Sequence, residues 1–134
     1  MNKRGFTLVE IMIVVIIIGI LVAMVAPRFA GRSDEARSMA SRTDIQANIA
    51  AALDLYEMDI GHFPTTDAGL RDLLKKPSDP DISARWKGPY LKKKPIDPWN
   101  HSYIYRTPSL HQMDYALYSM GKDGKEGGGD DINN

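Results

Sequence analysis

Cysteine is absent from the 134 residues, and neither charge is in excess, because 17 Lys and Arg face 17 Asp and Glu. Without cysteine, the chain has no disulfide scaffold, zinc ribbon, thiol redox site or cysteine nucleophile. Without a basic surplus, it does not fit a protein that wraps duplex nucleic acid, since such proteins neutralise phosphates with Lys and Arg. The sequence also has no H-E-x-x-H, G-x-S-x-G or P-loop, and its histidines match no zinc spacing. We therefore expect neither an enzyme nor a nucleic-acid-binding protein.

Polar residues are scarce in one segment near the N-terminus. All but three of the 21 residues from Phe6 to Ala26 are apolar, although the mean hydropathy of the whole chain is −0.30. A helix of this length spans about 31 Å, which matches the hydrocarbon core of a bilayer. A cleaved signal peptide fits poorly, because cleavage after Ala26 would put Met24 at the minus-three position and Pro27 directly after the cut. We expect an uncleaved anchor or a different kind of cleavage.

Glu10 is the residue in this segment that a plain anchor does not explain. A carboxylate in a membrane span costs on the order of 2.5 to 3.5 kcal/mol at the bilayer centre, and less near the interface. Such a residue is by default a candidate for function. The alternative is a carboxylate that lies at headgroup level, close to the start of the apolar run.

Residues 27–134 indicate a small polar domain that begins on a helix. Pro27 removes one backbone hydrogen bond and is expected to break or kink the helix, which resumes beyond it. A short helix is expected from about Asp67 to Lys75, with Thr66 as its N-cap. Between them, an apolar stripe at helical spacing leads to the stop signal Gly61 and predicts packing on a core; its members are Ala36, Met39, Ile45, Ile49, Leu53, Tyr56 and Ile60.

The C-terminal half favours loops and short strands. Five prolines make residues 77–99 a loop. In this loop, Asp97 is interpreted as a turn former, Trp99 as a packing aromatic and Lys92–Lys94 as a solvated triplet, not a site for single-stranded nucleic acid. Residues 101–106 and 115–120 are expected to be strands of an antiparallel sheet. The predicted fold class is α+β, with a long N-terminal helix followed by a small head.

Glycine and acidic residues dominate the C-terminal tail. Residues 121–131 contain five Gly and four carboxylates, a composition typical of a solvated, flexible terminus. The same composition suits a Ca²⁺ loop, because this hard cation takes roughly six to eight oxygen ligands and Gly lets carbonyl groups turn inward. It is not an EF-hand, since Lys125 and Gly127 stand where that motif needs oxygen ligands. The residues alone support a flexible terminus and a Ca²⁺ loop equally.

The N-terminal residues resemble the processing site of type IV pilins and type II secretion pseudopilins. Lys3-Arg4-Gly5-Phe6-Thr7-Leu8-Val9-Glu10 matches the short basic leader, the glycine and the Phe-Thr-Leu-x-Glu of that family. The resemblance implies that a prepilin peptidase cuts between Gly5 and Phe6 and methylates the new N-terminal Phe6. It also implies that Glu10 pairs with the α-amine of Phe6 on a neighbouring subunit inside a filament.

Further segments resemble the major pseudopilins of type II secretion in particular. They are Gly61-His62-Phe63-Pro64-Thr65, Gly88-Pro89-Tyr90-Leu91, Pro95-Ile96-Asp97-Pro98-Trp99, Tyr103-Ile104-Tyr105 and Ser119-Met120-Gly121-Lys122-Asp123-Gly124. Asn100 and His62 are mild departures from the family pattern. The resemblance favours the calcium loop, and it implies carboxylate ligands at Asp123, Asp130 and Asp131 and carbonyl ligands at Met120 and Gly128.

The resemblance also implies an organisation and a function. It divides the chain into a leader peptide at 1–5, a transmembrane and filament-core helix at 6–26, and a periplasmic head at 27–134. The expected function is that of the major structural subunit of a type II secretion pseudopilus, a homopolymer that grows from the inner membrane into the periplasm and drives folded proteins across the outer membrane. Expected partners are other copies, minor pseudopilins, the prepilin peptidase, the inner-membrane assembly platform and, before assembly, membrane lipid.

Two alternatives remain beside this expectation. A type IV pilin for adhesion, motility or DNA uptake is the nearer one. The lack of cysteine speaks against it, because many adhesive pilins close their C-terminal region with a disulfide. A membrane-tethered, Ca²⁺-binding enzyme or receptor domain is the second, and it leaves Glu10 and the Gly5–Phe6 junction unexplained.

Overall fold

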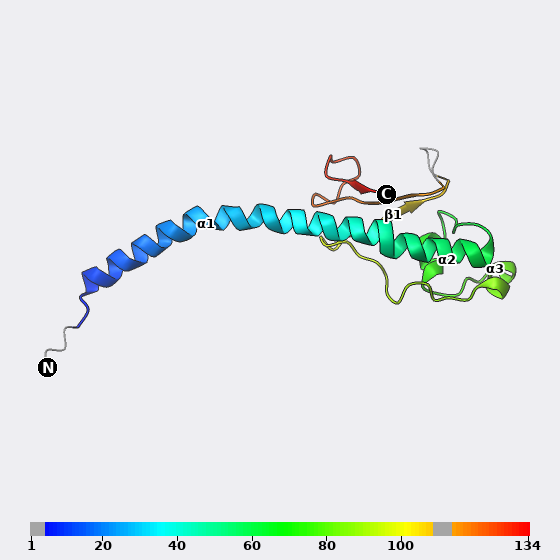
Figure 1. Cartoon of the computed structure of the whole chain (residues 1–134), viewed down its shortest axis with the longest axis horizontal. Coiled ribbons are helices and arrows are strands. Elements are labelled where there is room, and N and C mark those ends of the chain that lie inside the picture. Colours follow the sequence, from blue (N-terminus) through cyan, green and yellow to red (C-terminus); the bar gives the residue numbers. More distant parts are fainter. Residues whose placement is uncertain (1–4, 109–113) are drawn as a thin grey trace. The chain divides into compact units, whose positions relative to one another are not determined.

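The computed structural model describes residues 5–108 and 114–134, without the side chains of residues 28–30. It forms two compact units, Met1–Glu35 and Ala36–Asn134. Along the chain (Figure 1) the elements are α1 (Leu8–Thr43), the π-helix η1 (Asp44–Ile49), α2 (Ala50–Ile60), the 3-10 helix η2 (Gly69–Leu73), α3 (Pro80–Arg85), β1 (Ile104–Arg106), β2 (Ala116–Ser119) and β3 (Ile132–Asn133).

Among the described residues, the first unit consists of residues 5–7 and the N-terminal part of α1. Thr7 caps this helix, because the backbone N–H of Glu10 donates a hydrogen bond of 3.2 Å to Oγ1 of Thr7. α1 continues through Pro27, so the expected break is wrong. A proline removes one backbone bond, and the bonds of the turns on either side maintain the helix. Every large apolar side chain from Phe6 to Val25 is exposed, and the helix is long and apolar enough to cross a membrane.

The π-helix η1 lies between α1 and α2 and contains two buried residues of the predicted stripe, Ile45 and Ile49. The buried residues Ser41, Ile45 and Ile49 are spaced by four, which places them on one face of the helix. Ala36 and Met39 are exposed, so their predicted packing is wrong. Met39 lies two residues before Ser41, which places it about 200° away around the helix.

The three strands form one antiparallel sheet in the order β1-β2-β3. Ile104 of β1 pairs with Tyr118 of β2, and Ser119 of β2 pairs with Ile132 of β3. The strands predicted at 101–106 and 115–120 are confirmed in place but are shorter than expected. The sequence pattern does not predict β3, because its two residues show no alternation.

The helix expected at 67–75 differs from the structure in type and length. A 3-10 helix covers Gly69–Leu73, and its first residue, Gly69, has a φ of 58°. This left-handed conformation cannot be part of an α-helix, so a regular helix does not run through the segment. Thr66 is not a cap, because its hydroxyl group exchanges hydrogen bonds with the backbone of Thr107.

α3 lies within the segment that was expected to be a loop. Its N-cap is Asp79, whose Oδ1 accepts hydrogen bonds from the backbone N–H groups of Asp81 and Ile82. Pro80 occupies the first turn of the helix, where its missing N–H costs nothing. The Asp-Pro pair is therefore a start signal for a helix, which the high proline content of this segment conceals.

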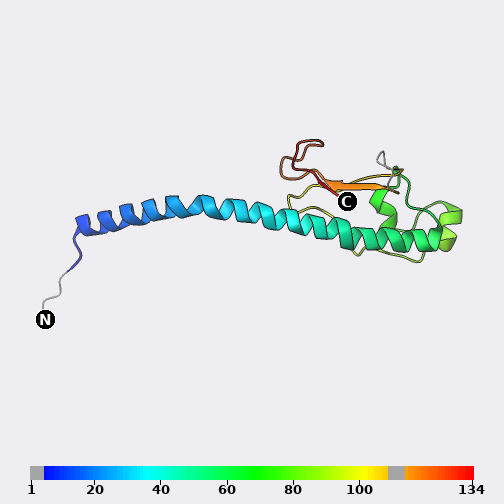
Figure 2. The same cartoon turned by 45° about the horizontal axis from the view of Figure 1, so that its top comes forward.

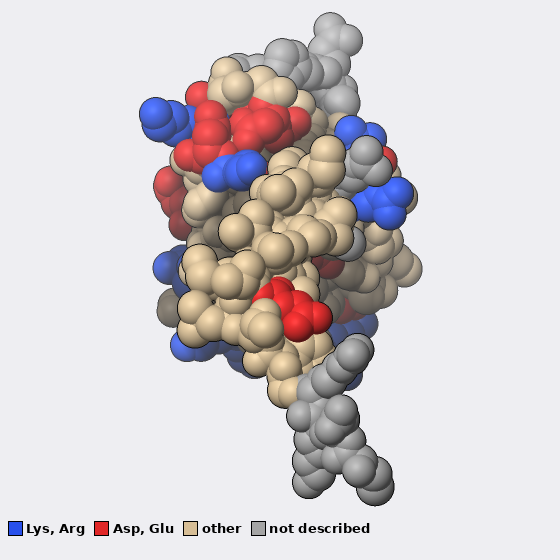
Figure 3. Space-filling view, turned by 90° about the vertical axis from the view of Figure 1, so that its left-hand side faces the viewer, with Lys and Arg blue, Asp and Glu red and all other residues tan. Residues whose placement is uncertain are grey.

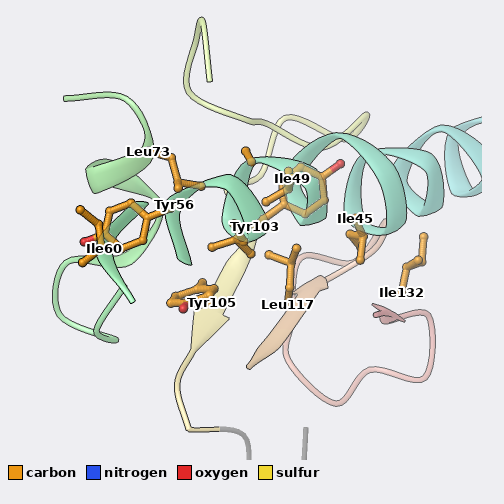
Figure 4. Close-up of a cluster of buried hydrophobic side chains, with 11 residues drawn as sticks. Ile45, Ile49, Tyr56, Ile60, Leu73, Tyr103, Tyr105, Leu117 and Ile132 are labelled. Carbon is orange, nitrogen blue, oxygen red and sulfur yellow. The ribbon is translucent and has the colours of Figure 1, made fainter. Parts of the chain in front are cut away.

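The core of the second unit lies between the helix formed by η1 and α2 and the sheet, and Figures 2 and 4 show the two side by side. Gly61 ends α2 with a φ of 95°, as its residue type predicts. The predicted α+β fold, a long N-terminal helix with a small antiparallel sheet, is confirmed. The buried apolar side chains of this core cluster are Ile45, Ile49, Ala52, Leu53, Tyr56, Ile60, Leu73, Tyr103, Tyr105, Leu117 and Ile132.

Candidate functional sites

The N-terminal site lies immediately before α1 and in its first turn. Gly5 and Phe6 have irregular backbone, and the Phe6 side chain is 78% exposed. Glu10 lies in the first turn of α1 and is exposed as well. A peptide bond in exposed, irregular backbone suits cleavage, because the chain can enter a peptidase without the unwinding of a helix. Residues 1–4 of the predicted leader lie outside the described residues.

The C-terminal site is the loop of residues 120–131, which joins β2 to β3. Acidic side chains gather in the upper part of the face shown in Figure 3, on the side of the sheet where this loop lies in Figure 1. Oδ2 of Asp130 accepts a hydrogen bond of 3.1 Å from the backbone N–H of Asp123, and this bond lowers the pKa of Asp130. Oδ2 of Asp131 accepts a bond of 2.7 Å from the N–H of Gly127. The acidic side chains thus hold the glycine-rich backbone in place.

Glu126, the remaining acidic residue of this loop, is hydrogen-bonded to side chains of the sheet. Nη1 and Nη2 of Arg106 donate to its two carboxylate oxygens at 2.7 and 3.0 Å, and the hydroxyl of Tyr118 donates to Oε1 at 2.6 Å. These bonds, that from Arg106 first, lower the pKa of Glu126 to about 2. Burial, and then the bond to Glu126, raise the pKa of Tyr118 to about 12. Glu126 therefore fixes the loop to β1 and β2 and is occupied by these partners.

The loop offers carboxylate and carbonyl oxygens, which are the ligand atoms that a hard cation such as Ca²⁺ prefers. Oδ1 of Asp131 is shielded from solvent and has no hydrogen-bond partner among the described residues, and a cation is one group that would satisfy it. The space that a β-carbon on Gly128 would take is filled by the carboxylate of Asp123, so these two predicted ligands lie in contact. In residues 5–108 and 114–134, however, no three His, Asp or Glu side chains converge closely enough to hold a metal. The loop gathers the predicted ligands, with Met120 at its start, into one segment.

Asp97 has a wider role than the turn former that the sequence predicts. Its Oδ1 accepts hydrogen bonds from the backbone N–H groups of Trp99 and His101, at 3.1 and 2.7 Å, which confirms the turn. In addition, Oγ of Ser119 donates to its Oδ2 at 2.6 Å. Asp97 is only 4% exposed and Ser119 is fully buried, so the pair ties this turn to the end of β2. The sequence carries no signal for the contact, because the two residues are 22 positions apart.

The basic triplet Lys92–Lys94 is exposed in the loop that precedes the Asp97 turn. The nearby aromatic rings of Trp86 and Tyr90 pack edge to face, with centroids 5.7 Å apart, and both lie against the core. Rings held in this way do not offer free faces on which bases could stack. The geometry supports the predicted solvated loop. Trp99 packs against the core as well, as its interpretation as a packing aromatic requires.

Two family models match the chain, and together they cover nearly all of it. Residues 28–134 match the model described as type II secretion system protein G, and residues 1–26 match the prokaryotic N-terminal methylation motif. The chain is 48% identical over 130 residues to the type II secretion system core protein G of Pseudomonas aeruginosa. This match covers 96% of this chain and 90% of that protein. It is 42% identical over 134 residues to the core protein G of Escherichia coli K12, with coverages of 99% and 91%.

A solved structure agrees with these matches. The chain is similar to the crystal structure of the major pseudopilin from the type 2 secretion system of enterohaemorrhagic Escherichia coli, with a TM-score of 0.69 and 32% identity over 78% of this chain and 87% of that chain. These relatives are structural subunits of a secretion machinery and not enzymes. With a family model that spans 28–134 and relatives that match over nearly their full length, the chain belongs to the type II secretion system protein G family, the major pseudopilins.

Proposed function

We propose that the chain is the major structural subunit of a type II secretion pseudopilus, which polymerises into a periplasmic filament and drives folded proteins across the outer membrane. One observation carries the proposal: the segment Phe6–Ala26, whose large apolar side chains are all exposed, follows directly on Gly5 and carries one carboxylate, Glu10. Exposed apolar surface of this extent needs an external partner. Membrane lipid supplies it before assembly, and other copies supply it in the filament.

Glu10 has a specific role in this proposal. Cleavage between Gly5 and Phe6 by a prepilin peptidase, followed by methylation, creates a charged amine close to the start of α1. Within a filament core, an isolated carboxylate is costly, and a pair with the Phe6 amine of a neighbouring copy removes most of that cost. The pairing therefore sets the register between copies. The proposed cleavage is checked by the intact mass of the membrane-bound protein: we expect 129 residues that begin at N-methylated Phe6. A mature chain that starts at Ala26, Pro27 or Gly31 would contradict it.

The proposed location and partners follow from the same architecture. The chain is an envelope-associated protein with a helix that can cross a membrane. We place this helix in the inner membrane as a single span, with the head in the periplasm. There it meets the assembly platform and the minor pseudopilins, which share the task of building the filament. The chain is a polymer subunit in this scheme, and its head supplies the outer layer of the filament.

A gene deletion tests this function against the type IV pilin alternative. Cells that lack the gene are expected to retain their exoproteins in the periplasm, while surface pili, twitching and DNA uptake continue unchanged. Complementation with the wild-type gene should restore secretion. Loss of surface pili with normal secretion would instead identify the chain as a type IV pilin subunit.

We also propose that the C-terminal loop binds Ca²⁺ through Asp123, Asp130 and Asp131 and the carbonyl groups of Met120 and Gly128. One support is Oδ1 of Asp131, which is shielded from solvent and has no hydrogen-bond partner in the part of the chain that the structure describes. The other is the contact between Asp123 and Gly128. When bound, the ion would supply positive charge among side chains that otherwise repel one another. The chain itself holds the loop in shape through the bonds that Asp130 and Asp131 accept from its backbone.

Thermal unfolding of the full chain in detergent micelles tests the calcium site. At a hundredfold excess over its dissociation constant, the ion should stabilise the folded head by about 2.7 kcal/mol. For a domain of this size, chelation should then lower the Tm by on the order of 10 °C. Asp123→Ala should remove this calcium dependence, and Asp67→Ala, at an exposed aspartate outside the loop, should keep it. Identical melting curves with calcium and with chelator would overturn the site and favour the solvated tail.

A further inference from the structure

A buried network lies beneath the first part of the C-terminal loop. Oγ of Ser119, which donates to Asp97, also accepts a hydrogen bond of 3.1 Å from the backbone N–H of Gly121. Nδ1 of His101 lies 3.2 Å from the carbonyl oxygen of Gly121 and donates to it in the tautomer that is protonated there. Ser119 therefore binds the backbone N–H of Gly121, and His101 binds its carbonyl oxygen. Both side chains belong to residues that are hydrogen-bonded to Asp97.

His101 also contacts the loop at a second residue, Gly124. A β-carbon on Gly124 would lie only 2.9 Å from Nε2 of His101, so the imidazole ring lies directly against the backbone at Gly124. The ring itself is well placed, because the backbone N–H of His101 donates to Oδ1 of Asp97 and its carbonyl accepts from the N–H of Asp97. The imidazole thus touches the loop at two points, and Asp123 lies between them.

The position of Gly121 has a consequence for the acidic side chains. Gly121 has a φ of 64°, and a β-carbon there would lie 2.6 Å from Oδ2 of Asp130. That same oxygen accepts the hydrogen bond from the backbone of Asp123. The side chains that hold Gly121 in place therefore also position the contact between Asp123 and Asp130, where the two ends of the loop meet. In a segment with five glycines, this order does not arise from the loop backbone alone, because glycine loses the most conformational freedom when it is fixed.

We propose that His101, with Asp97 and Ser119, is a positioning residue that orders residues 121–124 before any cation arrives and thereby raises the affinity of the loop for Ca²⁺. None of the three is a proposed ligand. They orient the loop backbone, in the way that residues hydrogen-bonded to a metal ligand orient that ligand in other metal sites. The proposal rests on the proposed calcium site, since affinity for the ion has meaning only if the loop binds it.

Calcium titration of the full chain in detergent micelles, freed of metal with a chelator, tests the proposal. His101→Ala removes both contacts and is expected to weaken calcium binding about tenfold to a hundredfold, the range known for outer partners of metal ligands. His101→Asn keeps a donor for the Gly121 carbonyl but lacks the ring edge at Gly124, so it should bind more tightly than the alanine variant and less tightly than wild type. His62→Ala, at an exposed histidine outside this network, is the matched control and should bind as wild type.

Hydrogen exchange in the presence of chelator supplies a second readout that does not depend on calcium. His101→Ala should speed exchange of the amides of residues 121–124 and leave those of β1 and β2 unchanged, which also shows that the variant is folded. Equal calcium affinity and equal exchange in His101→Ala and wild type would overturn the proposal. If wild type binds no calcium, the calcium site fails and with it the role in affinity. Faster exchange in the alanine variant would then still support the ordering role, and unchanged exchange would overturn that as well.

Discussion

The two units of the chain treat apolar surface in opposite ways. In Met1–Glu35, every large apolar side chain from Phe6 to Val25 is exposed, whereas in Ala36–Asn134 the side chains of Ile45, Leu53 and Leu117 are completely buried. Both units contain helix, so the difference lies in the pattern. Residues 6–26 are apolar on all sides of the helix, whereas η1 and α2 carry an apolar stripe that faces the sheet. The head therefore supplies its own core, while the first unit depends on lipid or on other copies.

Carboxylates show the same contrast. Asp97 of the head is 4% exposed and accepts hydrogen bonds from two backbone N–H groups and from Ser119, so the chain itself meets the cost of its burial. Glu10 of the first unit is exposed on an apolar helix, and in our account its partner comes from a second copy. The head is built to fold within one chain, and the first unit is built to assemble.

Glu10→Ala should have the largest effect of the changes considered, because it removes the proposed contact between copies. We expect cleavage and membrane insertion to continue, since loss of a charge eases insertion, while filaments are lost or greatly reduced. Glu35→Ala removes an exposed glutamate outside the apolar run and should leave assembly intact. Filament yield by electron microscopy, with membrane fractionation, separates these outcomes. Normal filaments from Glu10→Ala would refute the pairing.

A cavity in the head should have a large effect on folding. Leu53 is fully buried and Leu55, two residues further along α2, is 51% exposed. Leu53→Ala should destabilise the head by about 2 to 5 kcal/mol, whereas Leu55→Ala should stay within about 0.5 kcal/mol of wild type. Both tryptophans lie in the head, so denaturant unfolding followed by their fluorescence reports on this unit alone. Equal effects of the two substitutions would contradict the assigned core.

The ion pair of Glu126 should have the smallest effect on stability, and this effect should depend on pH only in the acid range. Its pKa in the folded head is lowered from 4.5 to about 2, so its contribution is present above about pH 4.5 and is lost as the pH falls toward 2. Glu126→Gln should therefore be less stable than wild type near neutral pH, and the difference should shrink across this range. Glu57→Gln, at an exposed glutamate of α2, serves as the control. A difference that stays constant from pH 5 to about 2 would exclude the pair as its cause.

Features carried by local sequence were largely predictable. The apolar run, the helix stop at Gly61 and the two longer strands all follow from the period or identity of neighbouring residues. Ile45, Ile49 and Leu53 were identified as core residues in this way. Met39 was not placed correctly, because the buried face continues from Ile45 to Ser41, four residues earlier, and a serine does not stand out in an apolar pattern.

Features that depend on distant residues were not predictable. The bond between Asp97 and Ser119 joins positions 22 apart. The contact of His101 with Gly121 joins positions 20 apart, on either side of the paired strands β1 and β2. The sequence indicates four acidic side chains in the C-terminal loop but does not reveal that Glu126 is bound by Arg106 and Tyr118. Local composition thus identifies a candidate loop, and the fold decides which of its carboxylates remain available.

A structure of the assembled filament by electron cryomicroscopy tests the central claim most directly. The account predicts that residues 6–26 of many copies lie together along the filament axis, that Glu10 of one copy lies within hydrogen-bond distance of the Phe6 amine of another, and that the heads form the outer layer with the core described above. Filaments held together by the heads alone, with the apolar helices exposed or away from the axis, would contradict it.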